Sequence, residues 1–308
     1  MNRYAERIMR EYPVRRKARE KENMRAYLVG CLRELGYDAR LQDCGRAVNV
    51  VAGAPEKAKL IFAAHYDTGL KEPLAPLICP TRPVTFALYQ ALTPVLALAA
   101  CFVVSVGVTF ALNAPNLTLP FFVALLIGAL AGLRYGPSET RNLNDNTSGV
   151  SALLETAEKL TPRYRGDAAF VFLDCGSTSM QGAKGFRKKY PSAKEKPVIC
   201  LDCVGSGDEL LILPGKYARW NGELLDAINE SFENTERKTC YNKVDGLVYH
   251  PSDNRAFRNG VAVCAVGRTF GMKRAICPTG KDDRIDDENI SLLRDGLVRL
   301  VAAYQVKR

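Results

Sequence analysis

The sequence predicts an α/β fold in which a sheet lies between helices, interrupted by a two-helix membrane hairpin. Three features indicate this: short runs of consecutive apolar residues, apolar stripes at helical spacing between them, and one long stretch without charge. The 308 residues are 47% apolar and 25% charged, an ordinary globular composition that excludes disordered and fibrous proteins.

The first element is a helix over residues 15–35, with Met24, Leu28 and Leu32 at helical spacing and Gly36 after its end. The next is a strand over residues 60–64, a continuous apolar run that predicts a central position in the sheet.

The membrane hairpin is expected at residues 83–133, which contain no Asp, Glu, Lys or Arg. Its two apolar segments, 84–112 and 117–133, are joined by a turn at residues 113–116. A spanning helix needs about 20 apolar residues, so the first segment is long enough and the second is at the short end of the range. A helical hairpin buried in a soluble core is the alternative, but such helices normally keep a polar face.

The flanks of the hairpin predict its orientation. Lys71 and Arg82 precede it, Arg134 and Arg141 follow it, and the connecting turn carries no charge. By the positive-inside rule both flanks are cytoplasmic. Ten cysteines without a framework spacing agree with a reducing compartment. We therefore expect a multi-pass protein of the cell membrane with two helices and a cytoplasmic soluble domain.

Beyond the hairpin, strands are predicted at 169–173, 198–201 and 261–266, and helical stripes at 150–160 and 292–300. Strands that alternate with helices favour a sheet covered on both faces. The expected organisation is residues 1–82 as the first part of the α/β domain, 83–133 as the inserted hairpin and 134–308 as the remainder.

Polar side chains suited to a metal lie at the ends of three of these elements. His65 and Asp67 come after the first strand, Asp145 stands at the entry to a helix, and Asp202 follows a later strand. Carboxylates and one imidazole suit zinc, and a shared carboxylate can hold two ions. Taken singly, each Asp is more often a helix cap or a loop anchor than a metal ligand.

The order of these motifs along the chain is more specific than any one of them. In this order the sequence resembles a known family, the zinc aminopeptidases, which also includes glutamate carboxypeptidase and glutaminyl cyclase. The resemblance covers nearly all of the soluble part. Its motifs are Leu35-Gly36-Tyr37, Asn49-Val50-Val51, Ala63-Ala64-His65-Tyr66-Asp67, Asn144-Asp145-Asn146-Thr147-Ser148-Gly149, Leu201-Asp202-Cys203-Val204-Gly205, Ser252-Asp253-Asn254-Arg255-Ala256-Phe257 and Arg284-Ile285-Asp286.

The resemblance implies a mixed, mostly parallel sheet sandwiched by helices. It also implies that His65 binds one metal, that Asp67 orients the His65 imidazole, that Asp145 bridges two metals and that Asp202 binds alongside His65.

The sequence departs from the family at three places. The family's Glu-Glu pair, its general base and a metal ligand, falls on Gly176 and Ser177. The last His ligand falls in a stretch where Cys277 is the candidate substitute. Asp174 and Cys175 are further candidates to replace a lost ligand, although an ungapped strand fixes their direction. Each cysteine is more often a small buried hydrophobe. Asn254 stands where many members have a His beside the substrate cleft. His250 is expected on a surface loop, with an approach to the site as the alternative.

These departures predict a membrane-anchored member with impaired or lost peptidase activity, a pseudoenzyme that keeps a peptide or amino-terminal ligand in the cleft. It would hold no zinc or one weakly bound ion. The first alternative is an active metallo-aminopeptidase or hydrolase with a rewired, mononuclear zinc site. The second is a non-enzymatic membrane interaction scaffold.

The formal charge of +10 leaves anionic partners open. The basic N-terminal helix and the basic residues between 187 and 196 are expected to attract anionic lipid, because a membrane is already implied. A solvated surface is the plain alternative. No nucleic-acid partner is expected, since no reading motif accompanies the basic residues.

Overall fold

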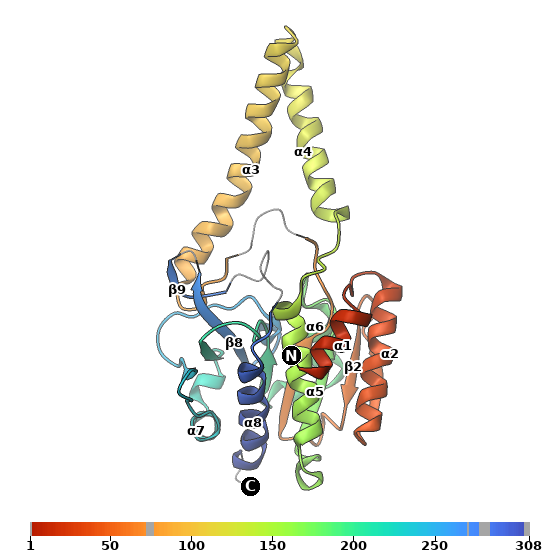
Figure 1. The fold of residues 1–308 in the computed structure, drawn as a ribbon, viewed down its shortest axis with the longest axis vertical. Helices are drawn as coiled ribbons and strands as arrows, with labels where there is room; N and C mark the ends of the chain where they lie inside the picture. Colours follow the sequence, from red (N-terminus) through yellow and green to blue (C-terminus); the bar gives the residue numbers. More distant parts are fainter. Residues whose placement is uncertain (1, 72–76, 270, 277–283, 305–308) are drawn as a thin grey trace.

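The computed structural model describes residues 2–71, 77–269, 271–276 and 284–304. Its centre is one sheet, with a pair of long helices, α3 and α4, that project from one end of the domain and meet at the tip (Figure 1). The predicted α/β fold with a mixed sheet is confirmed.

The sheet contains nine strands within the described residues, in the order β1-β2-β4-β3-β5-β8-β6-β7, with β9 paired to β8. The central strands β4, β3, β5 and β8 are parallel, and antiparallel pairs lie toward the edges. The strands are β1 (Ala39–Asp43), β2 (Val48–Ala52), β3 (Leu60–His65), β4 (Ala168–Leu173), β5 (Val198–Leu201), β6 (Glu209–Pro214), β7 (Thr239–Asn242), β8 (Gly260–Thr269) and β9 (Met272–Ala275).

Helices cover both faces of the sheet because its central strands are apolar on both sides. On β3, Leu60 and Phe62 pack into the core beneath α2, α5, α7 and α8, whereas Ile61 and Ala63 pack into a second core beneath α6. The helices are α1 (Arg3–Glu11), α2 (Ala18–Glu34), α3 (Pro83–Ala111), α4 (Thr118–Tyr135), α5 (Gly149–Lys159), α6 (Gln181–Lys189), α7 (Gly222–Ser231) and α8 (Asp287–Ala303).

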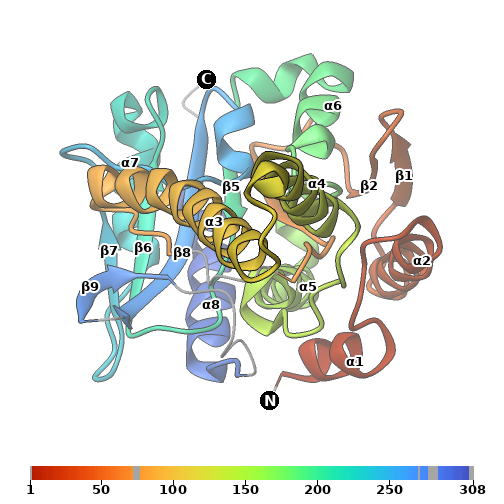
Figure 2. The same ribbon diagram turned by 90° about the horizontal axis from the view of Figure 1, so that it is seen from above.

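The hairpin forms as the uncharged stretch predicts, with α3 and α4 joined by a short turn at residues 112–117. Both helices are long and apolar enough to cross a membrane, judged by length and composition alone. Many of their apolar side chains are exposed; Phe110, for example, is 81% exposed. Figure 2 shows the two helices from above, standing over the sheet and diverging toward it.

Near the tip, polar groups join the two helices. The Ser105 hydroxyl donates to the Thr118 carbonyl over 2.6 Å, and the Thr109 and Thr118 hydroxyls lie 2.8 Å apart. These bonds satisfy hydroxyl groups that would otherwise face apolar surroundings. The hairpin is therefore held together at its tip by direct hydrogen bonds.

Candidate metal centre

His65, Asp145 and Asp202 converge because of the strand order. His65 ends β3, and Asp202 directly follows β5, the parallel neighbour of β3. Parallel neighbours end at the same edge of a sheet, which brings the two side chains together. Asp145 comes from the segment Leu143–Ser148, which leads from the hairpin into α5.

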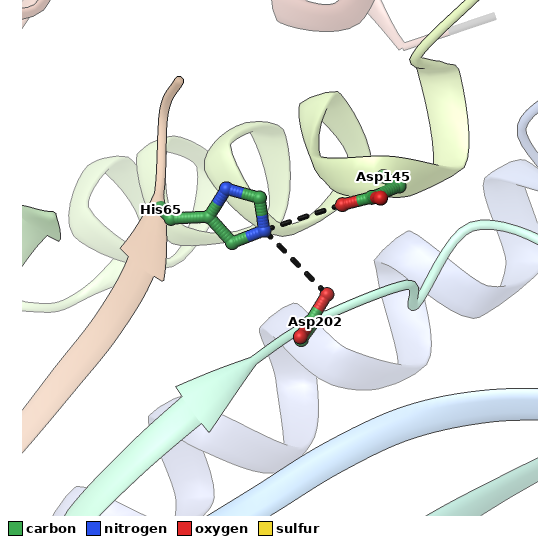
Figure 3. Close-up of side chains that lie close together, drawn as sticks. All are labelled: His65, Asp145 and Asp202. Carbon is green, nitrogen blue, oxygen red and sulfur yellow. Dashed lines mark ion pairs between the residues drawn. The ribbon is translucent and has the colours of Figure 1, made fainter. Parts of the chain in front are cut away.

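The three side chains point toward one another (Figure 3). The Nε2 atom of His65 lies 3.2 Å from Oδ1 of Asp145 and 3.6 Å from Oδ1 of Asp202. One ligand atom from each residue falls within 4.8 Å of the other two. His65 and Asp202 are buried, and Asp145 is partly exposed. One imidazole and two carboxylates at these separations fit a zinc-type ion.

The two asparagines beside Asp145 hold it against the end of β5. Asn144 Oδ1 accepts a hydrogen bond of 2.7 Å from the Gly205 amide. Asn146 Nδ2 donates to the Leu201 carbonyl over 2.9 Å. Both bonds reach the residues around Asp202, so the spacing between the two carboxylates is fixed by the Asn-Asp-Asn sequence.

Asp67 lies behind His65, on the other nitrogen of the ring. Its Oδ1 atom is 3.4 Å from His65 Nδ1 and accepts a 2.8 Å hydrogen bond from the Gly176 amide. The Ser177 hydroxyl donates to the other carboxylate oxygen. Asp67 thus has the position of a residue that orients the imidazole and raises its basicity.

Interactions within this cluster favour the charged forms of His65 and Asp202, although both side chains are buried. Burial opposes a charged His65 imidazole, but Asp145, Asp202 and Asp67 outweigh it and hold the pKa of His65 well above its usual value. Burial likewise opposes the Asp202 carboxylate, but His250 and His65 outweigh it and hold the pKa of Asp202 well below its usual value. Such concentrated buried charge favours a functional site over a purely structural one.

Gly176 and Ser177, the positions of the expected Glu-Glu pair, lie beside His65 and Asp67. A Cβ atom at Gly176 would overlap with Cβ of His65 and would lie 2.7 Å from Oδ2 of Asp253. The chain therefore has no room for a glutamate at position 176. In this protein the Gly176-Ser177 segment supplies hydrogen bonds to Asp67.

Asp174 and Cys175 also stay away from the centre. The Asp174 carboxylate pairs with Lys21 over 2.6 Å and accepts the Val48 amide over 3.0 Å. Cys175 Sγ lies 3.4 Å from Lys21 Nζ. Neither residue replaces a lost ligand here. Cys277, the other expected substitute, lies outside the described residues.

His250 corrects one expectation: it is not on the surface. It is 4% exposed, and its Nε2 atom lies 3.4 Å from Oδ2 of Asp202. The loop between β7 and β8 bends inward, which sequence periodicity could not reveal.

Asp253 was not anticipated as a site residue at all. It is 3% exposed, and its Oδ1 atom makes no hydrogen bond within the described part of the chain. Burial raises the pKa of Asp253 to about 7. Its position in the Ser252–Phe257 motif was the one available signal.

Two hollows border the cluster. One, of about 310 Å³, is lined by His250 and by Asn254, the predicted cleft residue. The other, of about 410 Å³, is lined by Asp67 and by Leu130 and Arg134 of α4. The second hollow places the end of the hairpin beside Asp67, the residue behind His65.

One protein-family model and several solved structures match this chain. The model of a protein family described as peptidase family M28 matches residues 133–287. No curated protein matches the chain by sequence.

Several solved structures share the fold. A glutaminyl cyclase of Bacteroides thetaiotaomicron aligns with a TM-score of 0.55 at 16% identity, over 99% of this chain and 96% of that one. The LapA aminopeptidase of Legionella pneumophila gives 0.58 at 11% identity, over 99% and 71%. A leucine aminopeptidase precursor from Bacteroides thetaiotaomicron gives 0.54 at 15% identity, over 99% and 95%.

Proposed function

The chain belongs to peptidase family M28, and from this premise we propose that it is a membrane-anchored, metal-binding member with impaired peptidase activity. One observation carries the proposal. His65, Asp145 and Asp202 lie within 4.8 Å of one another as a metal site requires, whereas the position expected for the general base is a glycine packed against His65.

The residues present fit one zinc ion. His65 Nε2 and the carboxylates of Asp145 and Asp202 would hold it, and Asp67 would orient the imidazole. When bound, zinc supplies a Lewis acid that polarises a substrate carbonyl. The Glu ligand of a second ion is absent at Ser177, whose hydroxyl donates to Asp67 instead. We therefore propose one ion.

The site lacks a general base at the two positions where the family resemblance places the Glu-Glu pair. A placed general base typically contributes about 10²–10⁴-fold in rate. Gly176 has no side chain, and a serine hydroxyl such as that of Ser177 is a poor base. The proposal is that the protein recognises amino-terminal or peptide-like ligands in the hollow beside Asn254 and cleaves them slowly or not at all.

One observation favours a second candidate, an active hydrolase with a rewired site. The Asp253 carboxyl is buried, and its Oδ1 has no hydrogen-bond partner among the described residues. Its Oδ2 lies 2.7 Å from where a side chain at position 176 would begin. An acid there with a pKa near 7 is suited to accept and return a proton at neutral pH. In this candidate Asp253 takes over the role of the missing glutamate.

The membrane part of the proposal rests on α3 and α4. Their 29 and 18 residues carry no acidic or basic side chain until Arg134, and the described residues of the domain leave their apolar surface almost entirely uncovered. The proposed orientation, with both flanks on the cytoplasmic side, follows from Lys71, Arg82, Arg134 and Arg141.

The basic N-terminal region would lie beside the anionic leaflet. Arg16 donates hydrogen bonds to the Arg134 carbonyl over 2.8 Å and to the Gly136 carbonyl over 3.1 Å, which fixes this region at the base of α4. Each basic residue near such a surface contributes about 1 kcal/mol of attraction.

The test uses the full chain, purified in detergent, stripped of metal and reloaded with zinc. Zinc content is measured together with hydrolysis of a panel of amino-acid amides and cyclisation of amino-terminal glutaminyl peptides. We expect at most one zinc, lost in Asp145→Ala, and very low turnover. Absence of zinc from the natural chain would overturn the proposal. Robust turnover that is lost in both Asp145→Ala and Asp253→Asn would establish the second candidate.

A further inference from the structure

His250 has the surroundings of a metal ligand rather than of a core histidine. It is 4% exposed and lies just before the turn Asp253–Ala256. Neither of its ring nitrogens makes a hydrogen bond to any described residue. A buried core imidazole normally donates from one nitrogen and accepts at the other, because unpaired buried polar atoms cost free energy. Both nitrogens of His250 lack such partners.

The His250 imidazole lies close to the Asp202 carboxylate. His250 Nε2 lies 3.4 Å from Oδ2 of Asp202, without hydrogen-bond geometry. Two atoms bound to one tetrahedral zinc at about 2.0–2.2 Å are roughly 3.3–3.5 Å apart. The separation of His250 and Asp202 therefore matches that of two ligands of a single ion.

The same spacing recurs across the cluster. His65 Nε2 lies 3.2 Å from Asp145 and 3.6 Å from Asp202. Asp202 presents Oδ1 to His65 and Oδ2 to His250, so its carboxylate lies between the two imidazoles. The expected ligand set has lost its last histidine, and the chain's only other histidine is found at the opposite oxygen of a retained ligand.

We propose that His250 is the second imidazole of the metal centre and replaces the missing histidine from a different loop. The inference rests on the proposed function, because it assumes the ion held by His65, Asp145 and Asp202. Two imidazoles with two carboxylates favour zinc and similar transition ions over magnesium or calcium, which prefer oxygen ligands alone.

The experiment counts ligands and does not depend on catalysis. The full chain in detergent is loaded with zinc, and X-ray absorption at the zinc edge gives the number of imidazole and sulfur ligands. Zinc affinity is measured by competition with a chelator of known affinity. The variants are His250→Leu and, as the matched control on the opposite side of Asp202, His65→Leu.

In the natural chain we expect two imidazoles and no sulfur, and in His250→Leu one imidazole. The affinity of His250→Leu should fall more than tenfold, since loss of even an outer partner of a ligand typically costs about 10–100-fold. Metal-free His250→Leu should unfold at the same temperature as the natural chain or higher, because the substitution removes unpaired buried polar atoms. If His250 were purely structural, the substitution would lower the unfolding temperature.

Three results would overturn the inference. If the natural chain shows one imidazole and His250→Leu binds zinc with unchanged affinity, His250 is excluded as a ligand. The proposed one-metal function would then stay intact. One imidazole together with sulfur would assign the missing ligand to a cysteine such as Cys277. Absence of zinc from the natural chain would overturn both the inference and the proposed function.

Discussion

The Arg15 guanidinium donates a 2.8 Å hydrogen bond to the side-chain oxygen of Asn142. The same guanidinium donates to the Tyr66 carbonyl over 2.6 Å. Tyr66 precedes the inserted hairpin and Asn142 follows it, so one buried side chain joins the two ends of the insertion. The link also connects the segments that carry His65 and Asp145.

Arg15→Ala should therefore be strongly destabilising. Arg15 is fully buried, and its removal leaves the Tyr66 carbonyl without its donor and takes one of two donors from Asn142 Oδ1. Hydrogen bonds to a charged group are worth about 1.5–3 kcal/mol each, so we expect a loss of about 3 kcal/mol or more in unfolding free energy. Arg10→Ala, at an exposed position, should change it by less than about 0.5 kcal/mol. Equal stability of the two variants would contradict the role of Arg15.

Gly176→Ala should destabilise the protein and weaken metal binding. The added methyl group would overlap with His65 and approach Asp253 to 2.7 Å, and overpacking of this kind costs about 1–3 kcal/mol. Gly166→Ala is the matched control, because no atom lies within 4 Å of its new methyl group. Thermal unfolding and zinc titration measure both effects. A gain of metal affinity in Gly176→Ala would show that the loop can open.

Asp253 should make stability depend on pH. Burial raises its pKa to about 7, above the value of about 4 in an unfolded chain. Between these values the folded protein keeps a proton that the unfolded chain releases. The carboxyl therefore stabilises the fold at low pH, and this contribution is lost as pH rises through about 7.

The measurement compares unfolding free energies of the natural chain and Asp253→Asn between pH 5 and pH 7, both with chelator. The natural chain should lose stability relative to Asp253→Asn by up to about 1.4 kcal/mol per pH unit. A difference that does not vary with pH would show that Asp253 keeps an ordinary pKa.

The hairpin orientation can be tested by labelling single cysteines in a background without the native ones. A cysteine at Asn116, in the exposed turn between the helices, should react with an impermeant reagent in intact cells. A cysteine at Lys71 should react only after the cells are opened. The reverse pattern would contradict the orientation, and recovery of the full chain without detergent would contradict the membrane span itself.

Many of the helices and strands depend on local sequence patterns and can therefore be predicted from the sequence. The apolar runs at 60–64 and 198–201 became β3 and β5, and the uncharged stretch became α3 and α4. Strand order could not be predicted in this way, because the insertion of β4 between β2 and β3 depends on contacts between residues far apart in the chain.

For the site, the motifs at two strand ends and at one helix entry select His65, Asp202 and Asp145. They could not decide between a surface position for His250 and its approach to the site, because it reaches Asp202 through an irregular loop without periodicity. Nor could they reveal that Gly176 is packed against His65, since the space around a glycine is set by neighbours distant in sequence. Their roles as ligands stay predictions until metal is measured.

The place of the hairpin in the strand order has a consequence for synthesis. The ribosome makes β2 and β3 before the hairpin and β4 after it, yet both early strands pair with β4 and not with each other. Given the proposed membrane span, α3 and α4 would enter the bilayer while β3 still lacks both of its partners, β4 and β5. The apolar residues of β3 would be exposed during that interval, a state prone to aggregation. Delayed or failed insertion of the hairpin would then be expected to harm the folding of the α/β domain as well as the membrane span.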